Sequence, residues 1–432
     1  MLEISDRLGE PILDTMCFLN DVVERYPEAI SFAPGRPAAE LFNVAQSLDV
    51  VRKHASAILG RRDVSPESAL NEIAQYGRTN GIVHEHVARQ LMNDEGLSVE
   101  SERLVITHGC QEAMLLLLLT VFTPPRDVLL ATEPVYQGIT AAARLLGIEV
   151  VPIRLQMHGP DLDQLEDVLA RLGAEHKVPR AFYIIPDFDN PSGYTTSLET
   201  RLRLVALARR RSLLLLEDSP YRMLRYEGPP LPLLKSIDPG QVVLLGSYSK
   251  SVYPGLRLGY LTGDVPVSLS GRTMPLSEVV SKAKSLVSIN TSPVMQAVLA
   301  SVLIEERHSL QSRMVGSASY YRKKRDVLLA ALDRHFAGKR APDVRWNRPE
   351  GGFFVTLEGR FAFTMPVVEA CASSAGVIVV PMSLFAFATP HDRSVRLSFS
   401  AVPLQDIDEG VSRLAGFFSG LAQSEQRLSK PA

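Results

Sequence analysis

The sequence predicts an α/β fold with a doubly wound, largely parallel sheet and a smaller α+β domain. Between about residues 65 and 300, continuously apolar runs of strand length alternate with helix-like segments. Continuously apolar runs are typical of strands that are covered on both faces, and their alternation with helices is typical of parallel sheets. The length of 432 residues also exceeds the usual size of one domain. We expect an N-terminal arm over residues 1–45 that joins the small domain, a large domain over 46–300 and a small domain over 301–432.

Seven apolar runs are expected to form the strands of the sheet. They are RLVITHG, DVLLATEP, EVVPIRL, AFYIIPD, SLLLLEDS, VVLLGSYS and RLGYLTG. Amphipathic segments lie between these runs and predict helices; one of them is SLETRLRLVALARRR. The serine that opens this segment, with a glutamate two residues later, is a partial signal for the start of a helix. The run AMLLLLLTVF is too short to span a bilayer and predicts a buried helix. One long helix is expected over about residues 293–335.

The composition argues against several classes of partner. A net charge of −2 gives no general attraction to nucleic acid or to an anionic membrane. The three cysteines are widely spaced and none is in a CxxC pair, which favours a reducing compartment without disulfides. The start of the chain lacks a signal peptide, so we expect a cytoplasmic protein. His84 and His86 would point apart on a helix, so we expect no metal site.

Polar residues gather where four of the predicted strands end. They are His108 to Cys110, then Asn190, then Asp218 with Tyr221, and finally Lys250. In an open parallel sheet, ligands bind at the carboxyl edges of the strands. Four such clusters exceed what ordinary loop composition predicts, so this edge is the expected binding site.

The residue types at this edge fit a pyridinium cofactor with an aldehyde and a phosphate. Asp218 ends a buried run and needs a cation or a proton, although a helix cap or an arginine pair explains most isolated aspartates. A pyridinium nitrogen needs such an anion, and the aldehyde needs a lysine amine such as that of Lys250. A phosphate needs backbone N–H groups at a helix start, which THGCQEA supplies, and a cation such as Arg257.

The chain resembles the class I/II pyridoxal-phosphate-dependent aminotransferases, with the aspartate-aminotransferase-like fold. The resemblance covers nearly the whole length and is closest to the branch of aminoadipate and kynurenine aminotransferases. It is carried in family order by QYGRTNG, ITHGCQEA, PDFDNPSG, LLEDSPY, GSYSKSVYPGLRLGY, RPEGGFF and VRLSFS. It implies the fold of type I pyridoxal 5'-phosphate enzymes: a mostly parallel seven-stranded sheet between helices, plus a smaller α+β domain.

The resemblance also implies roles for individual residues. Lys250 would form the Schiff base and move the substrate proton, and Asp218 would face the ring nitrogen. Asn190 and Tyr221 would bind the phenolic oxygen. Tyr136 would stack on the ring, although packing in the core is an equally simple explanation of this residue. The residues implied at the phosphate are Gly109, Cys110, Gln111, Ser247, Ser249 and Arg257.

Three further residues are implied in substrate binding and assembly. Arg396 would bind the substrate α-carboxylate with help from Asn190 and the Gly35 backbone, although a surface position also fits an arginine at a strand start. Tyr76 would reach the phosphate of the neighbouring subunit's cofactor. That role implies a homodimer with shared active sites.

The implied activity is the transfer of an amino group between an L-amino acid and a 2-oxo acid. The chain departs from the branch at His108, at Met382 and at DFDNP, where NFQNP is common. These positions leave open a β- or γ-substitution, elimination or cyclisation on the same scaffold. A ligand-sensing regulator without its DNA-binding domain is a remote alternative, because no basic recognition helix is visible. The side chain of the substrate cannot be named from the sequence.

Overall fold

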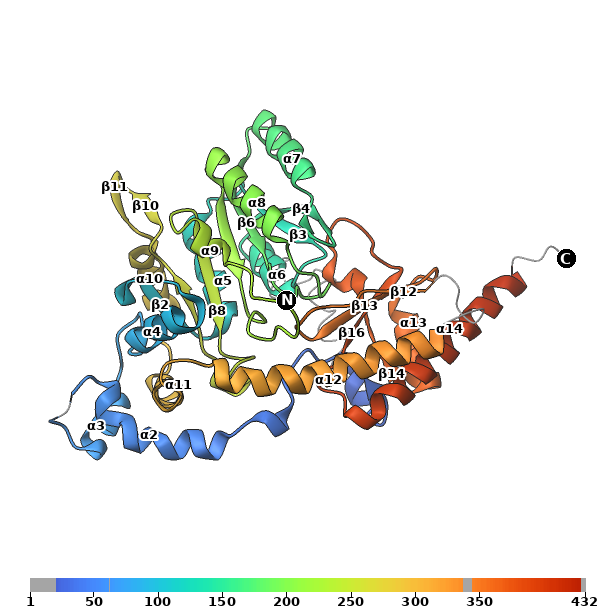
Figure 1. The fold of residues 1–432 in the computed structure, drawn as a ribbon. Coiled ribbons are helices and arrows are strands. Elements are labelled where there is room, and N and C mark those ends of the chain that lie inside the picture. Colours follow the sequence, from blue (N-terminus) through green and yellow to red (C-terminus); the bar gives the residue numbers. More distant parts are fainter. Residues whose placement is uncertain (1–20, 62, 337–343, 429–432) are drawn as a thin grey trace, which may run out of the picture.

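The structure, a computed structural model, describes residues 21–61, 63–336 and 344–428 (Figure 1). The first twenty residues of the predicted N-terminal arm lie outside the described residues. Within the described residues, the chain forms one large mixed sheet with helices on both faces and a smaller sheet beside it. The predicted α/β class is therefore confirmed.

The large sheet contains all seven predicted strands. Its spatial order is β2 (Leu104–Thr107), β9 (Gly259–Thr262), β8 (Val242–Ser247), β7 (Leu214–Asp218), β6 (Val178–Ile184), β3 (Asp127–Glu133), β4 (Glu149–Gln156) and β5 (Gly159–Pro160). From β8 to β4 all neighbours are parallel, whereas β9 pairs antiparallel with both β2 and β8. The two-residue β5, an antiparallel partner of β4 that was not predicted, adds an eighth strand at one edge.

Two layers of helices cover this sheet (Figure 1). One layer contains α5 (Gly109–Val121), α6 (Gln137–Leu145) and α10 (Leu276–Val287), and the other contains α7 (Leu162–Ala174), α8 (Leu198–Arg211) and α9 (Leu234–Ile237). The predicted buried helix is α5, and α8 begins where its serine signal placed it: Ser197 Oγ accepts from the Thr200 N–H at 3.2 Å. Because apolar side chains fill both faces of the sheet, its polar residues are left to the strand ends.

The remaining helices flank this core. They are α2 (Val44–Ile58), α3 (Pro66–Ile73), α4 (His84–Glu95), α11 (Pro293–Glu305), α12 (Gln311–Phe336), α13 (Met365–Ala370) and α14 (Ile407–Leu428). The prediction of one long helix over residues 293–335 is wrong, because α11 and α12 are separate. Arg307 and His308 between them have left-handed φ values of 52° and 58°. Asp94 on α4 then accepts from the Leu310 N–H at 3.0 Å, which fixes the break.

The smaller sheet follows α12 in the chain. Its order is β12 (Arg345–Trp346), β13 (Phe354–Glu358), β16 (Ser394–Ser398) and β15 (Val380–Pro381), all antiparallel. The short strand β1 (Ile30–Ser31) pairs with β14 (Val377–Ile378), and a separate hairpin joins β10 (Pro266–Leu269) to β11 (Arg272–Pro275). The β1–β14 pairing supports our proposal that residues 1–45 belong with a small domain over 301–432 and that 46–300 form the large domain.

A buried ion network supports the segment after β6. Asp187 accepts from Arg201 at 2.8 Å and from Arg222 and Arg225, each at 3.2 Å. Arg201 has no exposed side-chain surface and also donates to backbone carbonyls, so its charge is fully paired. The network anchors the turn that begins at Asp189 and that carries Asn190.

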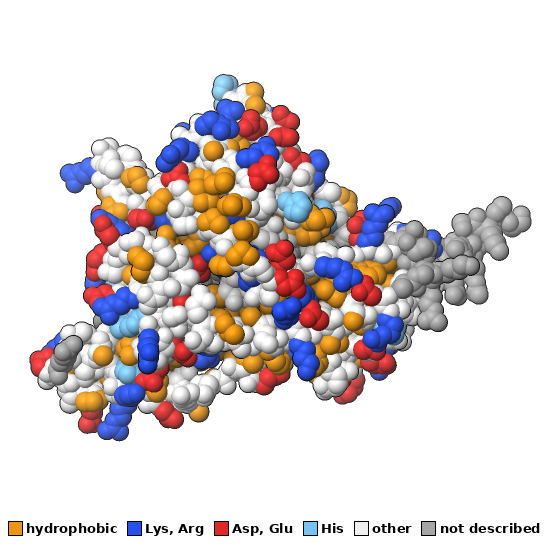
Figure 2. Space-filling view, in the orientation of Figure 1, with side chains coloured by type: hydrophobic (Ala, Val, Ile, Leu, Met, Phe, Trp, Pro, Cys, Tyr) orange, Lys and Arg blue, Asp and Glu red, His pale blue; other side chains and the backbone are white. Residues whose placement is uncertain are grey.

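The drawn face of the molecule intersperses acidic and basic side chains (Figure 2). No single sign of charge dominates this face. Within the part of the chain that the structure describes, no helix combines the length and apolarity needed to cross a bilayer.

Candidate active site

The ends of β7 and β8 and the loops beside them bring Asp218 and Lys250 to the same edge of the sheet. The two strands are parallel neighbours, with Asp218 paired in register with Leu245. Cys110, at the start of α5, acts electrostatically on both side chains. The edge predicted from the sequence is therefore where these groups gather.

Asp218 is buried, with 2% of its surface exposed, and only one of its two oxygens is paired. Tyr183 on β6 donates its hydroxyl to Oδ2 at 2.6 Å. Oδ1 has no hydrogen-bond partner among the residues that the structure describes. Burial raises the pKa of Asp218 to about 6, although the hydrogen bond from Tyr183 opposes this. The arrangement lacks a cationic donor at Oδ1, and a protonated ring nitrogen would supply one.

Lys250 is half-buried, and its amine lies among cations rather than carboxylates. Nζ donates to the Gly35 carbonyl at 3.0 Å and lies 5.9 Å from the centre of the Tyr221 ring. Burial lowers the pKa of Lys250 to about 8, and the charges of Arg257 and Arg396 act in the same direction. A substantial share of this amine is therefore neutral near pH 8, as a nucleophile or base requires.

The start of α5 forms a cradle with a free cation above it. Gly109 has a left-handed φ of 73°, and a Cβ at this position would lie 2.9 Å from the Arg257 guanidinium. Arg257 is exposed, and no hydrogen bond or ion pair holds its guanidinium within the described ranges. Ser247 Oγ accepts from the Ser249 N–H at 3.2 Å beside it. Helix N–H groups plus a cation suit a phosphate.

Cys110, Gln111 and Tyr136 line the same cradle. Cys110 donates its thiol to the Gly246 carbonyl at 3.1 Å, and burial raises its pKa well above the ordinary value, so it is a poor nucleophile. Gln111 donates to the Gly138 carbonyl at 2.9 Å. Tyr136 is half-buried, and burial raises its pKa to about 12. Its hydroxyl donates to Gln111 Oε1 at 3.4 Å.

Arg396 and Asn190 meet between the two sheets. Both are 7% exposed, and Arg396 donates to Asn190 Oδ1 and to the Ala33 carbonyl, each at 2.8 Å. Arg396 Nε has no partner, and burial lowers the pKa of the guanidinium to about 10. Because no carboxylate of the described residues pairs with this buried charge, an incoming carboxylate would complete it.

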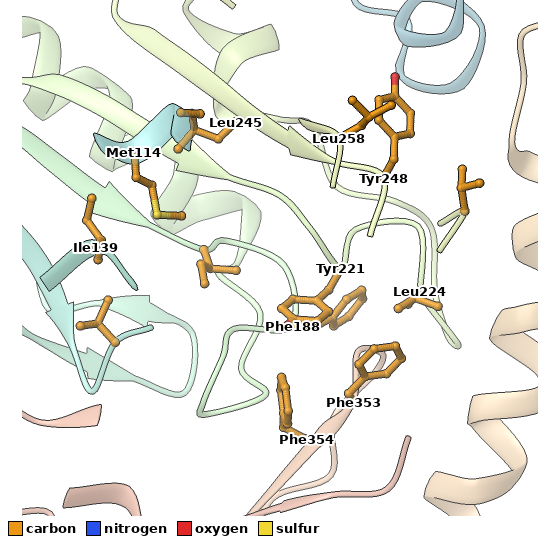
Figure 3. Packing of buried hydrophobic residues seen from close by; sticks show 14 of the residues in the cluster. Met114, Ile139, Phe188, Tyr221, Leu224, Leu245, Tyr248, Leu258, Phe353 and Phe354 are labelled. Carbon is orange, nitrogen blue, oxygen red and sulfur yellow. The ribbon is translucent and has the colours of Figure 1, made fainter. Parts of the chain in front are cut away.

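Aromatic side chains enclose these polar groups. Phe354 and Phe385 lie against the Arg396 guanidinium, which is 4.5 Å and 4.7 Å from their ring centres. Tyr221 meets Phe353 and Phe354 edge to face at 5.6 Å. Figure 3 shows Tyr221, Phe353 and Phe354 gathered with Phe188. Phe353, Phe354 and Tyr221 are themselves buried, and such apolar surroundings strengthen the electrostatic interactions of nearby charges.

Tyr76 lies apart from this cluster. It follows α3, and 84% of its surface is exposed. Met382, one of the residues that departs from the family pattern, is buried, whereas His108 is exposed at the start of α5. In the single chain, Tyr76 therefore lies outside the cluster of site residues.

His84 and His86, at the start of α4, lie in different surroundings. His86 Nδ1 lies 2.9 Å from His308 Nε2, and burial lowers the pKa of His86 to about 4. Elsewhere on α4, His84 Nε2 is buried without a partner. Over the described ranges, no group of three or more potential ligands is arranged to hold a metal ion.

These features can be tested against the cofactor that the sequence implied. The unpaired oxygen of Asp218 fits the ring nitrogen, and the neutral share of Lys250 fits the aldehyde. The cradle at Gly109 and the free cation of Arg257 fit the phosphate. The residues present therefore suit pyridoxal 5'-phosphate in charge and in chemistry.

Comparison with known proteins decides the family. The family model described as "Aminotransferase class I and II" matches residues 43–414. The chain belongs to that family. It is 36% identical to (S)-3,5-dihydroxyphenylglycine transaminase of Amycolatopsis orientalis over 413 residues, which cover 95% of this chain and 93% of the relative. It is 32% identical to 2-aminoadipate transaminase of Thermus thermophilus, with 91% of each chain covered.

Solved structures agree. A multiple substrate aminotransferase from Thermococcus profundus matches this aminotransferase with a TM-score of 0.82 and 28% identity, covering 98% of both chains. The α-aminoadipate aminotransferase of Thermus thermophilus, solved with N-(5'-phosphopyridoxyl)-L-leucine, matches with a TM-score of 0.78 and 30% identity, covering 97% of this chain and 98% of that one. The predictions of an aminotransferase, of its branch and of pyridoxal phosphate as its cofactor are confirmed.

Sequence reasoning missed several residues that shape the site. Tyr183 lies inside a strand, and only the alignment of β6 beside β7 brings its hydroxyl to Asp218. Phe354 lies on β13 of the smaller sheet, and Phe385 lies in the short segment between β15 and β16. Both rings contact Arg396, which is on β16. The GGFF motif could have pointed to Phe354 as a site residue, whereas no sequence motif marks Tyr183 or Phe385.

The protonation of Asp218 should appear in the stability of the cofactor-free protein. Its pKa is raised from 3.8 to about 6 on folding, so the folded state binds the proton more tightly. Its contribution to stability is present at low pH and is lost as pH rises from about 4 to about 6. Relative to Asp218→Asn, the wild type should lose on the order of 2–3 kcal/mol over that range.

Urea denaturation of both proteins across this pH range measures the difference. Asp218→Asn is the matched control, because it keeps the shape and an oxygen for Tyr183 but cannot ionise. With cofactor bound, the loss should largely vanish, because the ring nitrogen pairs with the carboxylate. Parallel stability curves for the two cofactor-free proteins would contradict this account of Asp218.

Proposed function

We propose that the protein transfers the amino group of an L-amino acid to a 2-oxo acid at this site. The observation that carries the proposal is the unpaired oxygen of the buried Asp218, at the same edge as the amine of Lys250. When bound, pyridoxal phosphate supplies an aldehyde that condenses with amines and a ring that accepts electrons from the carbon beside the amine. The remaining chemistry belongs to residues of the chain.

Lys250 and Asp218 would handle the protons. Lys250 would anchor the cofactor and then, once the substrate amine has replaced it, remove the proton from the substrate α-carbon and return it one position along. Its pKa of about 8 suits both tasks. Asp218 would hold a proton on the ring nitrogen, and Tyr221 and Asn190 would donate to the phenolic oxygen.

Arg396 would position the substrate. Its unpaired Nε and its contact with Asn190 support a bidentate grip on the α-carboxylate, and the Gly35 backbone would lie beside it. Gly109, Cys110, Gln111, Ser247, Ser249 and Arg257 would hold the phosphate, and Tyr136 would stack on the ring. The two named relatives act on dihydroxyphenylglycine and on 2-aminoadipate, so a substrate panel should contain amino acids with aromatic and with acidic side chains.

A homodimer would complete the phosphate site with Tyr76. Gly77, the next residue, lies against Asn290 and Pro293, so Tyr76 is near the start of α11. Exposed apolar side chains lie along the same stretch, at Leu286 (86%) and Ile289 (55%). Exposed apolar surface of this kind favours burial against a second copy. A role in cytoplasmic amino acid metabolism is consistent with the composition.

The function is tested by Lys250→Ala. Wild-type protein mixed with pyridoxal phosphate should gain a visible absorbance band, and adding a reactive amino acid should convert the band and release a 2-oxo acid. Lys250→Ala should lose the band and at least about 10³-fold in turnover, because both the anchor and the base are gone. Lys323→Ala, which removes an exposed lysine of α12, controls for the loss of a lysine elsewhere in the chain.

A wild type that stays colourless with saturating cofactor would contradict the proposal. A band that forms but releases a side-chain leaving group, with no 2-oxo acid, would replace transamination by elimination or substitution. Identical spectra for wild type and Lys250→Ala would remove Lys250 from the site.

Shared sites are tested by mixing two inactive subunits. Tyr76→Ala, at limiting cofactor, and Lys250→Ala should each have little activity alone. If Tyr76 serves the neighbouring subunit, a mixed dimer regains one intact site, and random mixing should restore about a quarter of wild-type activity. Should Tyr76 act within its own subunit, mixing would restore nothing. Recovery measured after subunit exchange therefore distinguishes the two arrangements.

A further inference from the structure

One turn links the cofactor side of the site to the smaller sheet. It runs from Asp189 to Gly193, after β6. The carboxylate of Asp189 accepts from the Ser192 N–H at 3.1 Å and from its hydroxyl at 2.7 Å. The Ser192 carbonyl accepts from Asn347 at 2.7 Å and from Thr356 at 3.0 Å, both in the smaller sheet. Asp189 therefore holds the turn whose next residue, Asn190, contacts Arg396.

The other oxygen of Asp189 is unexplained. Asp189 is 2% exposed, and its Oδ1 has no hydrogen-bond partner. A buried carboxylate without a cation is costly, and a glutamine, which is common at this position in the resembling branch, would carry no charge. The aspartate therefore adds an ionisable group that the turn itself does not need.

The groups around Asp189 favour its protonated form. Burial raises its pKa to about 7, and the charge of Asp218 on β7 acts in the same direction, while only the Ser192 hydrogen bonds lower it. The charge of Asp189 acts on Tyr221, which follows β7, and raises the pKa of its hydroxyl. From the smaller sheet, Asn347 and Thr356 are uncharged. Arg396 on β16 reaches the turn through Asn190, and its charge acts on both Tyr221 and Lys250.

We propose that Asp189 is a positioning residue that sets the proton affinity of the bound cofactor. It holds Asn190 through the Ser192 turn, and its carboxyl group titrates together with the cofactor joined to Lys250. The charge of Asp218 raises the proton affinity of Asp189, so the protonation of the two carboxyl groups is coupled. Once Asp218 is paired with the ring nitrogen, Asp189 is the carboxyl group of this pair that remains free to take up a proton. The proposal rests on the function proposed above.

The consequence is a link between substrate binding and proton uptake. An ionised Asp189 favours the protonated form of the cofactor–Lys250 linkage. A substrate carboxylate bound at Arg396 brings a second negative charge to the same region, so it drives Asp189 toward its neutral form. With a glutamine at this position, the contribution of Asp189 to this link would be absent.

The test is a pH titration of the cofactor absorbance. Asp189→Asn keeps an oxygen for Ser192 and removes only the charge. Removing a negative charge should lower the midpoint of the absorbance change by about half a unit to one unit. Asp189→Ser removes the charge with a smaller side chain, so a folding defect in one variant leaves the other to report.

Glu217→Gln is the matched control. Glu217 lies beside Asp218 on β7, is fully buried, and has a pKa raised by burial to about 7, like Asp189. Its side chain accepts from the N–H groups of Leu234 and Lys235 instead, on the face of the sheet covered by α9. Neutralising it should leave the midpoint unchanged.

A midpoint in both Asp189 variants equal to that of the wild type would overturn the proposal, as would an equal shift in Glu217→Gln. An upward shift would also overturn it, because the sign would be wrong. A wild type without any titrating cofactor band would overturn the proposed function itself, so the two failures are distinguishable. Proton uptake on binding an unreactive carboxylate, measured by calorimetry in buffers of different ionisation enthalpy, should fall in Asp189→Asn.

Discussion

The half-paired carboxylate of Asp218 is the constraint around which the site is organised. It lies at the end of a buried strand, where an ionised carboxylate is costly unless a cation meets it. Tyr183 satisfies one oxygen and leaves the other open. The protein therefore carries a local energetic cost that only a cationic ring nitrogen removes. Because only the ring nitrogen can pair with Asp218, this cost favours one orientation of the cofactor, with its aldehyde toward Lys250.

Cations and aromatic rings complete this arrangement from the opposite side. Burial, together with the charges of Arg257 and Arg396, keeps the amine of Lys250 partly neutral, although each arginine is placed for a different anion. The Arg396 charge is buried between Phe354 and Phe385 without a carboxylate partner. Before ligands arrive, the site thus has an excess of unpaired groups of both signs. Cofactor and substrate supply the missing partners, so binding energy and proton affinity are coupled throughout.

The sequence predicted those parts of the fold and site that depend on order along the chain. The seven apolar runs are strands, and the polar residues at their ends meet because parallel strands share a carboxyl edge. Contacts that depend on how neighbouring strands and loops align side by side could not be predicted from the sequence. Tyr183 meets Asp218 across two strands, and Phe385 meets Arg396 across a loop. The break at Arg307 and His308 was missed because neither residue is a glycine or proline.

The protonation state of the ring nitrogen tests the central claim most directly. Pyridoxal phosphate labelled with ¹⁵N in the ring, bound to the wild-type protein, reports by its chemical shift whether that nitrogen carries a proton. If Asp218 supplies the counter-charge, the nitrogen stays protonated at neutral and at mildly alkaline pH, and it loses the proton in Asp218→Asn. A wild-type spectrum of an unprotonated nitrogen at neutral pH, with the cofactor joined to Lys250, would contradict the account.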